Sequence, residues 1–303
     1  MISQEIADFV ATNTPLEAGH LPALSDFPLW RIEFDQQMTA LNPLAADIGF
    51  RRGEVGGVPG AWFEPPEGRR DVVLLYLHGG GLITSSPTGH SGMIGEVARA
   101  TGRLTWAPNY RLAPEHPFPA QRDDVIACYR GLLEQGYSAE QIVVVGDSAG
   151  GGLAVGLAMA IRDGGLPQPL GVVGLSSWTD LAHTGESIRT VADSVCTVDV
   201  LKLMASYVAG NADLCDPRLS PLYGDFTGLP PMLLMAGELE SLRDDTVRAG
   251  RLAERAGVEV NVAILPGLPH IWPWFVPSAP ESAQAYRTIA SYIFTLEARA
   301  GIR

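Results

Sequence analysis

Residues 142–152 read Ile-Val-Val-Val-Gly-Asp-Ser-Ala-Gly-Gly-Gly, and residues 153–161 continue as Leu-Ala-Val-Gly-Leu-Ala-Met-Ala-Ile. Four successive β-branched residues without polar alternation predict a strand buried on both faces, as in a parallel sheet. The second run is longer and rich in Ala and Leu, which predicts a buried helix. A strand that turns into a helix within so few residues strains the residue at the turn, and this is tolerated only where its neighbours are tiny. Gly146 and Gly150 supply that room, so the hydroxyl of Ser148 is expected at the top of the sheet as a nucleophile.

This strand, Gly-x-Ser-x-Gly and helix resemble the nucleophile elbow of the α/β-hydrolases. A simpler interpretation is that Ser148 only caps the helix that follows it. The position of the pentapeptide between a buried strand and a buried helix favours the nucleophile. In this fold the acid and then the histidine follow the serine along the chain.

Composition limits the partners. The chain has 303 residues, enough for one large α/β domain, and a formal net charge of −13. That charge argues against nucleic acid and anionic membranes, because it would repel phosphates. Residues 1–8 lack the basic start and apolar core of a signal peptide, and Asp147 interrupts the longest apolar stretch, so no membrane span is expected. An odd number of cysteines (Cys128, Cys196 and Cys215) suits a reducing compartment, and we expect a cytoplasmic protein.

Strands and helices alternate along the chain. Strands are expected over 55–63, 71–77, 104–107, 142–145, 170–176, 232–236 and 258–265, and helices over 93–101, 121–135, 153–161, 198–209, 246–256 and 282–299. Repeated βα units predict an α/β fold with a mostly parallel, doubly wound sheet. The segment from 178 to about 230 is too long for a simple crossover, and it would lie over the active-site face. Together with residues 1 to about 45, it is expected to form a helical cap on a single domain, 1–303.

A glycine run follows the strand over 71–77. Residues 78–81 read His-Gly-Gly-Gly, and successive glycines let the backbone approach a bound group and present N–H donors to it. The run lacks the last glycine of a dinucleotide fingerprint and the Gly-Lys-Ser/Thr of a phosphate loop. It fits acyl transfer, in which the amides of Gly79, Gly80 and Ala149 would hold an oxyanion.

Chain order selects the general base. Four of the six histidines precede Ser148, which leaves His183 and His270. His183 lies at the start of the insertion, before any later strand could supply the acid. His270 follows the strand over 258–265 through a Pro-Gly-Leu-Pro turn, so it is the predicted base.

The acid is expected just after the strand over 232–236. Glu238 and Glu240 are closest to its end, and their spacing does not separate them. Asp244 and Asp245 open a helix, where negative charge is favourable without a catalytic role. Either glutamate could hold the imidazole in the required tautomer.

Several motifs together resemble the hormone-sensitive-lipase-like branch of the α/β-hydrolases, in particular its bacterial carboxylesterases. They cover the chain from about residue 70 onward and lie at 78–81, 110–120, 146–151, 177–181, 219–223 and 228–231. The family usually carries Asp-Pro-Leu-x-Asp around its acid. Residues 240–244 read Glu-Ser-Leu-Arg-Asp, so the resemblance places Glu240 on the acid position, with Ser241 in place of the proline.

The resemblance further implies hydrolysis of short-chain esters of small molecules, no metal or cofactor, and a homodimer joined at a sheet edge. Two other functions stay open: a non-catalytic ligand-binding protein on the same fold, and a hydrolase for amides, lactones or longer lipids. Side chains that could line an acyl pocket, or simply fill the core, are Leu82, Ile83, Trp178, Trp272, Trp274 and Phe275.

Overall fold

The computed structural model describes residues 2–66 and 68–302. One eight-stranded sheet runs through the molecule in the order β1-β2-β4-β3-β5-β6-β7-β8. Its strands are β1 (Gly49–Val55), β2 (Val58–Glu64), β3 (Arg69–Leu77), β4 (Arg103–Pro108), β5 (Ile142–Asp147), β6 (Gly171–Leu175), β7 (Met232–Gly237) and β8 (Val260–Leu265). The pairs β1–β2 and β2–β4 are antiparallel, and the pairs from β4 to β8 are parallel. The predicted mostly parallel sheet is confirmed.

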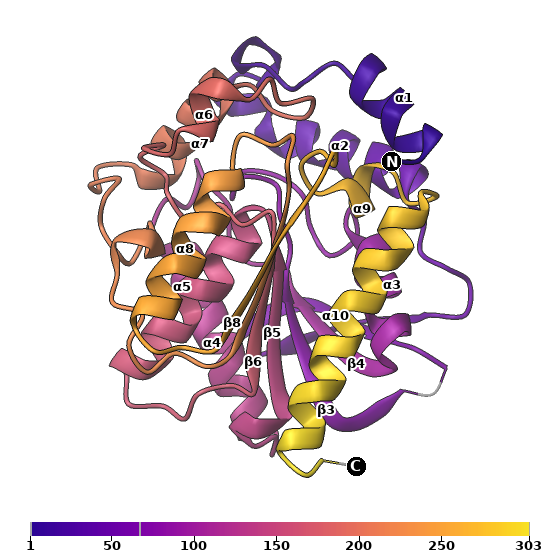
Figure 1. Cartoon of the computed structure of the whole chain (residues 1–303), viewed down its shortest axis with the longest axis vertical. Coiled ribbons are helices and arrows are strands. Elements are labelled where there is room, and N and C mark those ends of the chain that lie inside the picture. Colours follow the sequence, from indigo (N-terminus) through magenta and orange to yellow (C-terminus); the bar gives the residue numbers. More distant parts are fainter. Residues whose placement is uncertain (1, 67, 303) are drawn as a thin grey trace.

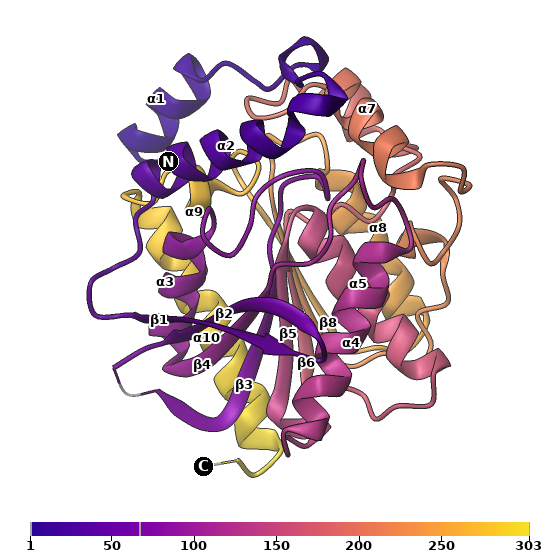
Figure 2. The same cartoon turned by 180° about the vertical axis from the view of Figure 1, so that it is seen from behind.

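Helices cover both faces of this sheet (Figures 1 and 2). The α-helices are α1 (Gln4–Thr12), α2 (Phe27–Leu41), α3 (Ser91–Thr101), α4 (Ala120–Glu134), α5 (Ala149–Asp163), α6 (Ser187–Thr190), α7 (Val198–Ala209), α8 (Arg243–Arg255), α9 (Trp272–Phe275) and α10 (Pro280–Arg299). Short 3₁₀ turns are η1 (Ala18–His20), η2 (Leu24–Asp26), η3 (Ala139–Gln141) and η4 (Pro221–Tyr223). Helices α4, α5 and α8 pack on one face, and α3 and α10 pack on the other, as a doubly wound sheet requires.

The sequence of β5 shows why both faces are covered. All six of its residues are buried. Ile142 and Val144 belong to the core beneath α4 and α5, whereas Val143 and Val145 belong to the core beneath α3 and α10. Because the strand contacts a hydrophobic core on each side, its sequence has no polar alternation.

The first strands differ from the prediction. The segment 55–63 is not one strand: Gly56 and Gly57 form a turn at positive φ, and β1 and β2 flank it as a hairpin. Most of β1 is exposed and contains Arg51, Arg52 and Glu54, so it shows little hydrophobic signal. Charged side chains of this kind are typical of an edge strand.

Two segments distant in sequence meet beyond the carboxyl ends of the parallel strands. Helices α1, α2 and α7 all lie at the top of Figures 1 and 2, and the turn η1 contacts α7. Leu16 donates its N–H to the carbonyl of Val195 (2.7 Å), and Thr197 donates its N–H to the carbonyl of Leu16 (3.0 Å). The Asn13 amide also donates to the carbonyl of Ser194 (2.6 Å). These bonds join the N-terminal segment to the insertion.

None of the helices in the described part of the chain combines the length and apolar composition needed to cross a bilayer.

Candidate active site

Ser148 lies at the sharp turn between β5 and α5. Its backbone has φ 52° and ψ −122°, which is the strain expected from the sequence. A Cβ at Gly146 would lie 2.3 Å from the carbonyl oxygen of Gly150, and a Cβ at Gly150 would lie 2.0 Å from that of Leu77. Both glycines are therefore required for the close packing of the turn against its neighbours.

His270 and Glu240 extend a chain of hydrogen bonds from this serine. The Nε2 of His270 lies 3.0 Å from Ser148 Oγ, and its Nδ1 lies 2.8 Å from Glu240 Oε2. The imidazole is 4 % exposed and Glu240 is fully buried, so little water screens the pair. The structure thus brings together the three side chains singled out in the sequence.

Burial alone would lower the pKa of His270. The hydrogen bond that His270 donates to Glu240 and the negative charges of Glu240, Asp193 and Asp147 outweigh this effect, and the pKa of His270 is raised. Burial in turn raises the pKa of Glu240, although its hydrogen bond with His270 acts in the opposite direction. A carboxylate beside Nδ1 leaves Nε2 free to exchange a proton with the serine hydroxyl.

The other carboxylates near the end of β7 have different partners. Glu238 is exposed and accepts a hydrogen bond from the N–H of Gly267 (2.9 Å), in the turn that leads to His270. Asp244 and Asp245 lie in the first turn of α8. Of the two glutamates that the sequence left open, only Glu240 contacts the imidazole.

The glycine run needs one correction. The N–H of Gly79 donates to Asp147 Oδ1 (3.2 Å), so it is not the free oxyanion donor expected from the sequence. Gly80 and Gly81, at φ 100° and 62°, line the pocket instead. Ala149 is the first residue of α5, and N–H groups in the first turn of a helix have no intrahelical partner. The amides available at the pocket are therefore those of Gly80, Gly81 and Ala149.

Asp147 and His90 form a buried support below the pocket. Asp147 accepts a hydrogen bond from Tyr76 Oη (2.9 Å) and lies 3.1 Å from His90 Nε2. The other ring nitrogen of His90 lies 2.6 Å from Ser85 Oγ, and the ring stacks on Trp274 at 3.9 Å. Burial would raise the pKa of Asp147, but His90 and Tyr76 together lower it. Sequence reasoning missed His90, because chain order discards every histidine before the nucleophile.

A cavity of about 240 Å³ surrounds the Ser148 hydroxyl. Its apolar lining contains Phe34, Trp178, Val195, Leu201, Met204, Ile271, Trp274 and Phe275, and residues 13–16 and His20 also line it. This volume is below the range of drug-sized pockets, so it suits a small ligand. Of the aromatic residues named from the sequence, Trp178, Trp274 and Phe275 line the cavity, whereas Trp272 is buried in the core under α10. In the described ranges, no group of three or more His, Cys, Asp or Glu side chains could hold a metal ion.

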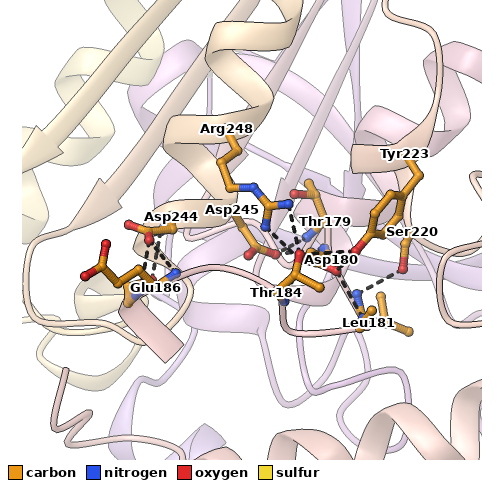
Figure 3. Close-up of polar contacts among 12 residues, drawn as sticks. Thr179, Asp180, Leu181, Thr184, Glu186, Ser220, Tyr223, Asp244, Asp245 and Arg248 are labelled. Atoms are coloured by element: carbon orange, nitrogen blue, oxygen red, sulfur yellow. Dashed lines mark hydrogen bonds and ion pairs between the residues drawn. The ribbon is translucent and has the colours of Figure 1, made fainter. Parts of the chain in front are cut away.

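The start of the insertion is anchored to α8 by buried carboxylates (Figure 3). Asp180 accepts hydrogen bonds from Tyr223 Oη (2.9 Å) and Arg248 Nη1 (2.8 Å). Asp245 accepts the N–H groups of Thr179 and Asp180, both at 2.8 Å. Burial and the nearby charge of Asp180 raise the pKa of Asp245 well above its usual range.

A second carboxylate links the insertion to the acid. Asp193 Oδ2 accepts the N–H of Ser241 (2.7 Å), the residue after Glu240. Its Oδ1 accepts the N–H of Val195 (2.8 Å), which lies in the wall of the cavity. One side chain of the insertion thus contacts both the acid loop and the cavity wall.

Comparisons with known proteins agree with this geometry. Residues 74–273 match a family model described as alpha/beta hydrolase fold. The chain is 37 % identical over 275 residues to an acetyl-hydrolase of Streptomyces hygroscopicus, covering 88 % of this chain and 89 % of that protein. It is 34 % identical over 226 residues to an ethyl acetate hydrolase of Pseudomonas putida, covering 70 % of each. A solved esterase of the bacterial hormone-sensitive lipase family superposes with a TM-score of 0.89 at 36 % identity, covering 97 % of this chain and 98 % of that one.

Proposed function

Because this chain belongs to the α/β-hydrolase fold family, in its hormone-sensitive-lipase-like branch, we propose that it is a serine carboxylesterase for short-chain esters. The observation that carries the proposal is the continuous contact from Ser148 Oγ through His270 to Glu240, at 3.0 and 2.8 Å. These distances are those of a nucleophile, its base and the group that orients the base.

The reaction proceeds in two halves. Ser148 Oγ attacks the ester carbonyl carbon while its proton passes to His270 Nε2. The bond to the leaving alcohol then breaks, and His270 gives that proton to the alcohol oxygen. Water, deprotonated by His270, attacks the acyl-enzyme, and the proton returns to Ser148 as the carboxylic acid leaves. Glu240 stabilises the imidazolium at each stage.

The amides of Gly80, Gly81 and Ala149 would hold the negative oxygen of each tetrahedral intermediate. The hydrogen bond from the N–H of Gly79 to Asp147 holds Gly79 in place, and with it the backbone of the glycine run 78–81. Loss of one donor of this kind typically costs about a hundredfold or more in kcat.

The cavity supports a small ester. Its volume of about 240 Å³ leaves room for a short acyl group and a small alcohol. The named activities of the acetyl-hydrolase and the ethyl acetate hydrolase point in the same direction. Residues 1–45 and 178–230 act as the cap that encloses the substrate, because both segments contribute residues to the lining of the cavity.

We further propose that the protein is cytoplasmic and forms a homodimer. Strand β8 is the last strand of the sheet, so its outer backbone groups can pair with a second copy, and Val262 on it is 44 % exposed. The three free thiols fit a reducing compartment. The molar mass from light scattering tests the dimer.

Ser148→Ala tests the chemistry. We expect loss of turnover on p-nitrophenyl acetate and butyrate, with an unchanged circular dichroism spectrum. The parent should also react with one equivalent of an organophosphate, and Ser148→Ala should not. A pure binding protein would show neither turnover nor stoichiometric labelling, and retained turnover in Ser148→Ala would refute the nucleophile.

A further inference from the structure

The cavity around Ser148 has two sides with different chemical demands. The leaving alcohol must receive its proton from His270 Nε2, and we assign it to the part of the cavity lined by Ile271 and Trp274. These two residues belong to the core beneath α3 and α10. We assign the acyl group to the part lined by Trp178, which belongs to the core beneath α4 and α5.

A second, narrower cavity of about 20 Å³ begins behind Trp178 and follows α5. Trp178 lines both cavities. The α5 residues that border the second cavity are Ala149, Gly152, Leu153, Gly156 and Leu157. Their spacing of three and four residues places them on one face of the helix, starting next to the nucleophile.

Gly156 has no steric reason to be a glycine. A Cβ built on it meets no heavy atom within 4 Å, whereas a Cβ on Gly152 would lie 2.0 Å from the carbonyl oxygen of Trp178. A glycine inside a helix costs about 1 kcal/mol relative to alanine. Gly156 therefore keeps space open along the second cavity at a cost to helix stability.

Trp178 closes that space from the catalytic side. Its side chain is 1 % exposed, and its ring stacks on His183 with the centroids 5.5 Å apart. Its buried indole Nε1–H has no hydrogen-bond partner. A smaller apolar side chain at this position would open the partition without breaking a side-chain hydrogen bond.

We propose that Trp178 is the residue that limits the acyl chain to a short length, and that the cavity along α5 is the site that a longer apolar acyl chain would occupy. The inference rests on the proposed esterase function and adds its substrate limit. Most of the lining of the cavity along α5 is apolar, including Leu82, Val125 and Leu181, and it suits methylene groups. Arg122 and Arg218 are its charged members.

Trp178→Leu tests the limit. We expect kcat/KM for p-nitrophenyl octanoate, divided by kcat/KM for p-nitrophenyl butyrate, to rise about tenfold. This factor corresponds to the free energy of burying roughly two methylene groups. Adding Gly156→Ala takes up part of the cavity along α5, so the double variant should move back toward the parent ratio. Gly156→Ala alone adds a Cβ that meets no heavy atom within 4 Å, so it should leave kcat/KM for the acetate and butyrate unchanged.

Organophosphate labelling separates the two proposals. A Trp178→Leu protein that labels with one equivalent but keeps the parent ratio overturns the acyl limit and leaves the esterase intact. A gain that Gly156→Ala does not reduce overturns the cavity along α5 as the location. Trp178→Phe is the milder variant, because it keeps an aromatic ring against His183. If neither Trp178 variant reacts with the organophosphate, Trp178 has a structural role and the proposal is overturned.

Discussion

Replacing Glu240 by glutamine removes the charge behind the base and changes little in volume. In the parent, Glu240 Oε2 lies 2.8 Å from His270 Nδ1, and Glu240 is fully buried. With charge centres about 4 Å apart and an effective dielectric constant of about 20, the carboxylate stabilises the imidazolium by about 4 kcal/mol. Glu240→Gln should therefore lower kcat by about a thousandfold. The loss reaches about ten-thousandfold if the amide also holds the wrong tautomer.

Glu238→Gln is the matched control. It makes the same change two residues earlier, on an exposed side chain whose oxygen can still accept the N–H of Gly267. We expect its kcat on p-nitrophenyl butyrate to stay within about twofold of the parent, since surface changes usually have small effects. Both variants should show native circular dichroism. A drop of less than about tenfold in Glu240→Gln, or an equal drop in Glu238→Gln, would refute the assignment of the acid.

Three further predictions use other contacts. Asp193→Asn removes a charge that helps to raise the pKa of His270, so the acid limb of the profile of kcat/KM against pH should move to lower pH. The control Asp199→Asn changes an exposed residue in the first turn of α7 and should leave the acid limb in place. An equal shift in both variants would show a general charge effect and contradict the specific role of Asp193. Asp245 has a folded-state pKa raised above its ordinary 3.8, so its contribution to stability is present at low pH and is lost as pH rises through the folded pKa. Asp245→Asn still offers an oxygen to both N–H donors, so its Tm should fall less than the parent Tm as the pH is raised above 3.8. At the highest pH tested it should not be below the parent Tm, and a steeper fall would contradict this account. Gly150→Ala puts a Cβ 2.0 Å from a carbonyl oxygen of β3, so soluble expression should be lost, and an active, folded variant would contradict the packing of the elbow.

The sequence predicted the features that depend on local pattern or chain order. The buried run of β5 and the small residues around Ser148 indicated both the central strand and the strained turn. Chain order left His183 and His270, and the position of His270 just after the last predicted strand selected it. Strand β1 of the hairpin was not predicted, because its side chains are mostly exposed and many are charged. Such a segment has no hydrophobic periodicity from which a strand could be predicted.

The remaining features depend on which way a loop turns. Glu238 and Glu240 differ by two residues, yet one faces solvent and the other is buried against the imidazole. Similarly, Gly79 and Gly80 are adjacent, but the N–H of Gly79 already donates a hydrogen bond to Asp147. His90 and Asp193 act through contacts far along the chain, which no spacing rule encodes.

The departure from the family pattern around the acid has a structural counterpart in the insertion. The family usually has proline after its acid, and proline fixes its own φ but has no N–H to donate. Here Ser241 occupies that position, and its N–H donates to Asp193 at 2.7 Å. A hydrogen bond to a carboxylate is stronger than one to a neutral acceptor. This bond can therefore restrict the loop that carries Glu240, as the ring of a proline does in the family. Because Asp193 also binds the N–H of Val195, the orientation of Glu240 depends on a contact that passes through the cavity wall.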